Sequence, residues 1–153
     1  MKSNISFNST LTKFGIGLFE TIKVTDYPLD LDLHMNRLFN SIKELNLSIE
    51  NDKEFYKETI LKYIKENNVK NKALRLTVFD EGYNISLRDI TYNEDTYKKG
   101  FSLCISPIKR GDSIIYRHKT TNYFESMYSK HYATDRNFND AIFLDSLSNI
   151  LEC

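Results

Sequence analysis

The sequence contains few of the residues that mark specialised proteins: two cysteines, two prolines, five glycines and no tryptophan among 153 residues. Cys104 and Cys153 have neither CxxC spacing nor a neighbouring histidine, which excludes a disulfide framework and a zinc site, so we expect no metal. No apolar run approaches the roughly 18–20 residues of a membrane span, and the first residues lack the hydrophobic stretch of a signal peptide. We therefore expect a cytoplasmic protein without a membrane partner.

An excess of charge of one sign is also lacking, because 21 basic and 21 acidic side chains cancel. A formal net charge of +0 provides no overall field that would attract nucleic acid or an anionic membrane. Hydrophobic residues make up 41% of the chain. A chain of about this length buries roughly 68–70% of the surface that it exposes when unfolded. These values exclude a disordered tail and predict an ordinary globular protein with its own core.

The first part of the chain shows two kinds of periodicity. Residues 17–24 alternate as in a β-strand, which places Glu20 on one face with three aliphatic side chains. From about Asp32 the apolar residues follow helical spacing, and a second helix is expected over residues 52–67. The same reasoning predicts strands over residues 72–79, 83–90 and 101–106, with a turn at Glu81-Gly82.

Pro107 and the pair Gly111-Asp112 interrupt this pattern and mark the expected boundary between two lobes. We expect a small N-terminal domain over residues 1–110 and the beginning of a larger domain over residues 111–153. Because strands and helices are mixed without strict alternation, the fold class is α+β.

The second lobe is expected to begin with a short extended segment over residues 114–119. Asn122 opens a helix with an apolar side, a strand follows over residues 140–145, and residues 150–153 begin the return strand of a hairpin. The helix carries Phe124, Met127, Tyr128 and His131 on that side.

The chain has no GxGxxG, P-loop, HExxH or GxSxG motif, which leaves dinucleotide-binding proteins, zinc proteases and serine hydrolases without support. Lys119 is the first candidate for chemistry, because it follows Arg117 and His118. Adjacent cations disfavour a further positive charge, and a neutral lysine amine can form a Schiff base. The simpler interpretation of this segment is a solvated basic run.

Two further segments contain charged residues next to apolar ones. Arg37 and His34 lie on one side of the first helix, next to its apolar stripe, where an arginine can clamp a phosphate or simply face solvent. Glu152 occupies an apolar strand, where a carboxylate needs a partner unless the position is at an exposed edge.

Four stretches, taken in order, resemble the class IV aminotransferase family, the fold type IV enzymes that use pyridoxal 5′-phosphate. They are Phe14-Gly-Ile-Gly-Leu-Phe-Glu-Thr-Ile-Lys-Val24, then Leu33-His-Met-Asn-Arg-Leu38 with Ser41, then Lys119-Thr-Thr-Asn-Tyr123, and finally Asn139-Asp-Ala-Ile-Phe-Leu-Asp145 leading to Glu152. The resemblance implies a two-lobed fold, with an N-terminal α/β sandwich lobe and the start of a second, barrel-like lobe.

The resemblance also implies a role for each matching residue. Lys119 corresponds to the lysine that binds the cofactor covalently and then moves a proton, and Arg37 to the arginine that holds the cofactor phosphate. Glu152 corresponds to the carboxylate that pairs with the pyridine nitrogen, and Tyr123 to a tyrosine that in some members bonds the ring oxygen. The substrate would contact two further residues, Phe19 as the aromatic lining of its pocket and Arg75 through its carboxylate.

The spacing from Lys119 to Asn122 resembles that of aminodeoxychorismate lyases and D-amino-acid transaminases, and the compact beginning favours the lyase. Such an enzyme converts 4-amino-4-deoxychorismate into 4-aminobenzoate, a folate precursor, and pyruvate. A small amino-acid transaminase of the D-amino-acid or branched-chain type is the alternative. Family members continue for about a hundred residues past the glutamate, so we expect these 153 residues to be a truncated stretch that is inactive alone.

The resemblance implies a small amino compound as substrate and a homodimer as the assembly. Two other classes remain open: a structural or interaction domain, and a protein that binds single-stranded nucleic acid. Residues 116–136 interleave aromatic and basic side chains, which can stack on bases and neutralise phosphates. Because the same aromatic residues have helical spacing, we expect them to lie in the core and expect no nucleic-acid partner.

Overall fold

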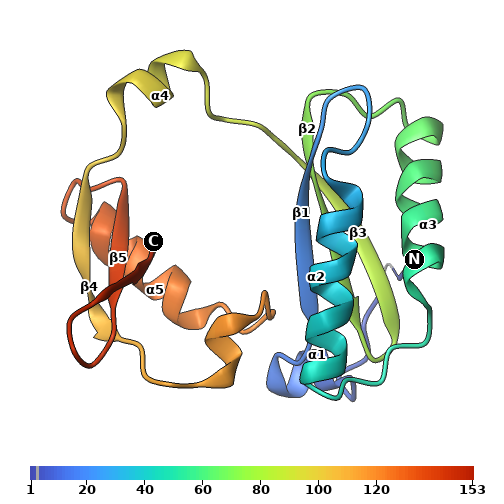
Figure 1. Cartoon of the computed structure of the whole chain (residues 1–153), viewed down its shortest axis with the longest axis horizontal. Helices are drawn as coiled ribbons and strands as arrows, with labels where there is room; N and C mark the ends of the chain where they lie inside the picture. Colours follow the sequence, from blue (N-terminus) through green and yellow to red (C-terminus); the bar gives the residue numbers. More distant parts are fainter. Residues whose placement is uncertain (3) are drawn as a thin grey trace. The chain divides into compact units, whose positions relative to one another are not determined.

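The computed structural model describes residues 1–2 and 4–153, and the chain divides into two compact units (Figure 1). The first unit comprises residues 1–90 and 118–122, and the second comprises residues 91–117 and 123–153. Both units combine helices with a sheet, which confirms the predicted α+β class. Within the described part of the chain, no helix is long and apolar enough to cross a membrane.

The first unit contains a three-stranded antiparallel sheet in the order β1-β2-β3. Its strands are β1 (Leu18–Val24), β2 (Lys72–Phe79) and β3 (Gly82–Asp89), and its helices are α1 (Thr10–Phe14), α2 (Leu31–Glu44) and α3 (Lys53–Glu66). β1, α2, α3 and β2 lie where their periodicity predicts them.

The core of the first unit lies between α2, α3 and one face of this sheet. Alternate strand residues point to the same face, so the apolar positions of β1 and β2 form one continuous surface for the two helices. The buried cluster consists of Leu18, Ile22, Val24, Met35, Leu38, Tyr56, Ile60, Ile64, Val69, Leu74, Leu76, Val78 and Ile85. All of these residues belong to the first unit, and Glu20 shares their face of β1.

The second unit contains a three-stranded sheet in the order β4-β5-β6. β4 (Leu103–Lys109) runs parallel to β5 (Asp140–Leu144), and β6 (Ile150–Glu152) pairs antiparallel with β5. Helix α5 (Phe124–Thr134) packs on β4 and β5, and the unit also contains α4 (Glu94–Lys99) and the 3₁₀ helix η1 (Ile114–Arg117). The prediction of an extended segment over residues 114–119 is therefore wrong for residues 114–117, which form the 3₁₀ helix.

The sequence places a boundary after Arg110, whereas the two compact units divide after Ile90. The chain crosses into the second unit after Ile90, and β4 forms a sheet with β5 of that unit. Pro107 lies inside β4 instead of ending it. The strand is at the edge of its sheet and its register shifts between Ile105 and Lys109, and both features allow a residue that cannot donate a ladder hydrogen bond.

The side of α5 that packs on the sheet is also not the predicted one. Ser129 and Ala133 are the buried residues of α5, whereas Phe124 is 77% exposed and Tyr128 is half exposed. Small side chains permit a close approach of this helix to the sheet, and the Ser129 Oγ lies 2.8 Å from the Ser106 Oγ. The expectation that the aromatic residues of this helix form core is therefore wrong.

Candidate functional site

Three of the predicted site residues meet on the face of the first unit's sheet that α2 does not cover. Phe19 points to this face from β1, and Arg75 reaches it from β2, where Thr21 and Arg75 are paired across the strands. The Arg75 guanidinium carbon lies 3.7 Å from the centroid of the Phe19 ring, and the Lys119 Nζ lies 5.5 Å from it. The electron-rich ring therefore lies beside two cationic side chains.

Lys119 reaches this face because residues 118–122 return to the first unit and continue its sheet beyond β1. The Phe19 N–H donates to the Lys119 carbonyl oxygen at 2.9 Å, and the Thr121 N–H donates to the Gly17 carbonyl oxygen at 2.9 Å. The Thr121 hydroxyl also donates to the Gly15 carbonyl oxygen at 2.5 Å. The backbone of the candidate lysine is thus fixed to the edge of a sheet.

Gly17 makes this close approach possible. A β-carbon at this position would lie 3.1 Å from the Thr121 Oγ1, from the Val78 carbonyl oxygen and from a methyl group of Leu11. These distances are shorter than ordinary van der Waals contacts, so a side chain here would push the Lys119 segment away from β1.

Arg37 lies on α2 and binds a buried carboxylate of β1. The Glu20 side chain is only 1% exposed and accepts from Arg37 Nε at 2.7 Å and from Arg37 Nη2 at 2.5 Å. The Nδ1 of His34, one helical turn before Arg37, lies 2.7 Å from the second oxygen of the same carboxylate. Burial raises the pKa of Glu20, but the hydrogen bonds and charges of Arg37 and His34 outweigh it, so the pKa lies below its ordinary value.

Arg37 retains donors for a ligand. A guanidinium has five N–H groups, and the bonds to Glu20 engage only Nε and Nη2. Its side chain is half exposed to solvent. The first unit thus holds a planar guanidinium on α2 and a primary amine beside Phe19. A guanidinium is a group that can bind a phosphate, and a primary amine is one that can react with an aldehyde.

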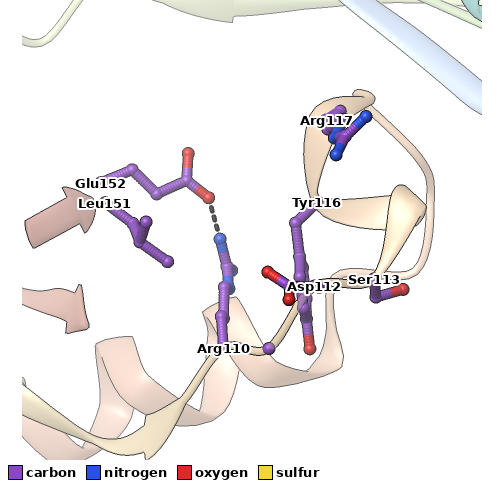
Figure 2. A pocket seen from close by; sticks show the side chains of 8 residues that line it. Arg110, Asp112, Ser113, Tyr116, Arg117, Leu151 and Glu152 are labelled. Atoms are coloured by element: carbon purple, nitrogen blue, oxygen red, sulfur yellow. Dashed lines mark hydrogen bonds and ion pairs between the residues drawn. The ribbon is translucent and has the colours of Figure 1, made fainter. Parts of the chain in front are cut away.

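In the second unit, Glu152 forms an ion pair with Arg110, which the sequence did not single out (Figure 2). The Arg110 side chain is 7% exposed, and its Nη1 donates to a Glu152 oxygen. The pair borders a cavity of about 300 Å³ that is also lined by Tyr116, Arg117 and Leu151. Glu152 itself is 57% exposed on the edge strand β6, so the exposed-edge alternative holds, and its partner Arg110 lies 42 residues away in the sequence.

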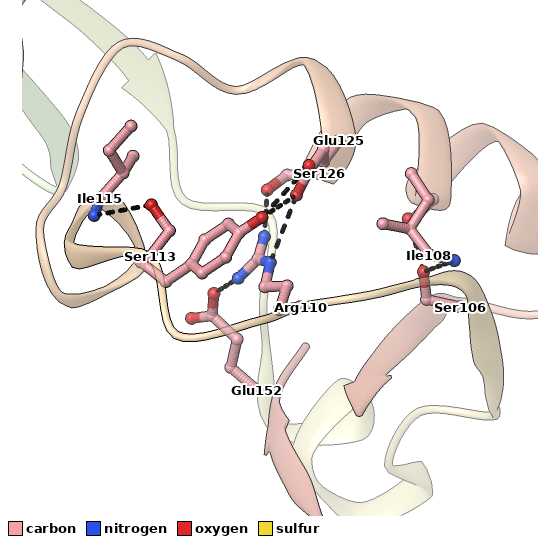
Figure 3. Close-up of polar contacts among 10 residues, drawn as sticks. Ser106, Ile108, Arg110, Ser113, Ile115, Glu125, Ser126 and Glu152 are labelled. Carbon is pink, nitrogen blue, oxygen red and sulfur yellow. Dashed lines mark hydrogen bonds and ion pairs between the residues drawn. The ribbon is translucent and has the colours of Figure 1, made fainter. Parts of the chain in front are cut away.

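Arg110 is held in place by contacts on several sides (Figure 3). Its Nη2 donates to the Ser126 Oγ at 3.0 Å, and its guanidinium carbon lies 3.7 Å from the centroid of the Phe143 ring. The Tyr116 ring lies against another side of the guanidinium, and its hydroxyl donates to Glu125 at 3.2 Å. Burial raises the pKa of Tyr116, and the hydrogen bond to Glu125 raises it further. These contacts restrict where the Arg110 guanidinium can lie when it pairs with Glu152.

The remaining candidate, Tyr123, is at the N-cap position of α5 and belongs to the second unit, as does Glu152. The structure thus brings Phe19, Arg75 and Lys119 together and places Arg37 on the helix that covers the opposite face of their sheet. Sequence reasoning noted that Glu20 lies on the aliphatic face but did not identify it as the partner of Arg37. The signal was present, because a lone carboxylate among aliphatic residues requires a cation nearby.

Residues 17–153 match the protein family described as amino-transferase class IV. The chain is 26% identical over 138 residues to an aminodeoxychorismate lyase of Bacillus subtilis (strain 168), and this alignment covers 76% of the chain and 45% of that protein.

Solved structures show the same fold. A provisional 4-amino-4-deoxychorismate lyase from Legionella pneumophila is 19% identical, with a TM-score of 0.84 over 98% of this chain and 60% of its own. A branched-chain aminotransferase from Thermoproteus uzoniensis, solved with norvaline, is 19% identical, with a TM-score of 0.84 over 99% of this chain and 58% of its own. Another branched-chain amino acid aminotransferase of this fold was solved with pyridoxamine 5′-phosphate. The chain therefore spans about half the length of the proteins that it matches.

Proposed function

Because the chain belongs to the class IV aminotransferase family, we propose that it binds pyridoxal 5′-phosphate and that Lys119 is the covalent attachment point. The observation that carries the proposal is the position of Lys119, whose backbone is fixed to β1 and whose amine lies beside Phe19 and Arg75.

We propose that Arg37 binds the phosphate of the cofactor, since its guanidinium is oriented by Glu20 and keeps N–H groups for a ligand. Glu152 is proposed to accept a hydrogen bond from the pyridine nitrogen and so keep that nitrogen protonated, and Tyr123 to donate to the ring oxygen. When bound, the cofactor supplies an electron sink for negative charge at the substrate carbon. Lys119 then moves the proton to and from that carbon as an amine.

The substrate we propose is 4-amino-4-deoxychorismate, which is cleaved into 4-aminobenzoate and pyruvate. The name of the Bacillus subtilis relative supports this choice. We propose that Arg75 binds a substrate carboxylate and that the ring of the substrate packs on Phe19. The contact between the Arg75 guanidinium and the Phe19 ring supports this pairing of roles.

A small amino-acid transaminase is the second candidate, since aminotransferases of branched-chain amino acids share the fold equally well. The two activities are separated by mixing a protein that contains this chain with each substrate. A lyase releases 4-aminobenzoate repeatedly without a second substrate. A transaminase releases no more than one equivalent of 2-oxo acid per site until an acceptor is added. We also propose that the protein is cytoplasmic and that it forms a homodimer, and light scattering of the purified protein tests the dimer.

The attachment point is tested by incubating the chain with pyridoxal 5′-phosphate, adding borohydride and locating the added mass by peptide mass spectrometry. We predict that the wild-type chain carries the adduct on Lys119 and that Lys119→Ala loses it, because only an amine can form a reducible bond with the aldehyde.

Lys23→Ala is the matched control, since Lys23 is an exposed lysine of the neighbouring strand β1. This variant should keep the adduct on Lys119. An adduct spread over many lysines in the wild-type chain, with no preference for Lys119, would contradict the proposal.

A further inference from the structure

His118 is a buried histidine immediately before Lys119, and none of the roles proposed above uses it. Only 4% of its side chain is exposed. We propose that His118 is a positioning residue that fixes the Lys119 segment to α2 and so directs the lysine amine to the face that carries Phe19 and Arg75. This inference rests on the function proposed for Lys119.

The hydrogen bonds of Ser41 determine which ring nitrogen of His118 carries a proton. The Ser41 Oγ lies 3.0 Å from the Arg37 carbonyl oxygen, which can only accept, so the single hydroxyl hydrogen is used there. The His118 Nδ1 lies 2.9 Å from the same Oγ and must therefore donate to it. One serine thus links the Lys119 segment to the backbone of Arg37.

The other ring nitrogen of His118 faces the same helix. Its Nε2 lies 3.6 Å from a carboxylate oxygen of Glu44, and it has no hydrogen-bond partner within the described residues 1–2 and 4–153. Ser41 and Glu44 are three positions apart, so they lie on one side of α2. The imidazole is therefore held against a single face of this helix by its hydrogen bond to Ser41, and its second nitrogen lies near Glu44.

His118 and Lys119 are neighbours in the chain, but their side chains contact groups on opposite faces of the first unit's sheet. α2 lies against the sheet face that contains Glu20, and His118 points toward this helix. The Lys119 side chain lies on the other face, where its amine is 5.5 Å from the centroid of the Phe19 ring. The bonds to β1 fix one side of the segment, and His118 fixes the other.

Such a double attachment matters for a lysine that has to reach one carbon atom. A displacement of about 1 Å in a reacting group can cost on the order of 100-fold in rate. The hydrogen bonds to β1 restrain the backbone at Lys119 and Thr121, but none of them is made by His118. The contact of His118 with Ser41 adds a restraint on the α2 side of the segment.

The test compares His118→Leu with His118→Asn, because the asparagine amide can take the place of Nδ1 as a donor to Ser41. Two quantities are measured: amide hydrogen exchange over residues 17–21 and 118–122 without cofactor, and the rate of the borohydride-stable attachment of pyridoxal 5′-phosphate to Lys119. Since a neutral hydrogen bond is lost, His118→Leu should accelerate exchange and slow attachment by about fivefold to tenfold. His118→Asn should restore most of both values.

His131→Leu is the matched control, since His131 is an exposed histidine of α5, and it should change neither quantity. If His118→Leu fails to fold, Ser41→Ala removes the acceptor of the same bond and should give the same two changes. Wild-type exchange and attachment rates in the folded variants would overturn the inference and leave the proposed function intact. A wild-type chain without any Lys119 adduct would overturn the proposed function, while the exchange rates would still decide whether His118 anchors the segment.

Discussion

At the scale of single residues, the carboxylate of Glu20 determines how Arg37 can act. The charge is buried in the core face of β1, and it is tolerated because Arg37 binds it through two nitrogens and His34 adds a third contact. Removing Arg37 would leave this carboxylate with His34 alone. Arg37→Ala is therefore expected to weaken the fold as well as phosphate binding, and Arg37→Lys, which keeps a cation near Glu20, separates the two effects better.

Glu20 should also make the stability of the protein depend on pH. Its pKa is lower in the folded chain than the ordinary value of 4.5, so the ionised carboxylate stabilises the fold above that pH, and this stabilisation is lost as the pH falls through the lowered value. We predict that Glu20→Gln reduces the free energy of unfolding at neutral pH by about 1–3 kcal/mol. As the pH falls from about one unit above the ordinary glutamate pKa through the lowered pKa of Glu20, the unfolding free energy of this variant should fall less steeply than that of the wild type.

Urea denaturation at a series of pH values measures the unfolding free energy and so tests this prediction. Glu58→Gln provides the control, because Glu58 is an exposed glutamate of α3, and it should follow the wild-type curve. A Glu20→Gln variant with wild-type stability at neutral pH would show that the buried carboxylate contributes no net stabilisation.

At the scale of secondary structure, the attachment of residues 118–122 to β1 depends on a strand edge without a side chain at Gly17. We predict that Gly17→Ala lowers the free energy of unfolding by about 1–3 kcal/mol, because its β-carbon would crowd Thr121 and the Val78 carbonyl oxygen. The same variant should accelerate amide exchange at Thr121, whose N–H donates to the Gly17 carbonyl oxygen.

Gly111→Ala is the matched control, since a β-carbon at Gly111 would meet no atom within 4 Å. Its unfolding free energy should lie within about 0.5 kcal/mol of the wild type. Unchanged exchange at Thr121 in Gly17→Ala would show that the Lys119 segment can adjust without losing its bonds to β1.

At the scale of the whole molecule, the two units differ in how much apolar surface they bury. The core cluster lies entirely in the first unit, whereas the buried apolar residues of the second unit are Ala133, Ala141 and Phe143 among the described residues. Burial of large apolar side chains provides most of the stability of a domain. In this 153-residue chain, the second unit should therefore open at a lower free energy than the first.

Amide hydrogen exchange at increasing urea concentration tests this difference, and we predict that β4 and β5 lose protection before β1 and β2. Phe143→Ala should lower protection mainly in the second unit, while Leu76→Ala should lower it mainly in the first, since these two residues are buried in different units. Equal protection of both sheets at every urea concentration would show that the chain unfolds as one cooperative body.

The sequence by itself determined the elements whose burial pattern is local. β1, β2, α2 and α3 were predictable because a strand buried on one face and a helix buried on one stripe repeat their apolar residues with periods of two and 3.6. The four family stretches likewise identified Lys119, Arg37 and Glu152 as candidates, since their order along the chain requires no knowledge of distances.

Only the tertiary structure decided the features that depend on contacts between distant segments. The apolar side of α5 faces away from its sheet because the small residues Ser129 and Ala133 permit the closer packing. β4 joins the second unit despite Pro107, because it pairs with a strand that follows more than 30 residues later. The partners Glu20, Arg110 and His118 were not assigned from the sequence for the same reason: a periodic pattern shows which face of an element is apolar, whereas the ion pair or hydrogen bond of a buried polar group is set by whichever distant element packs there.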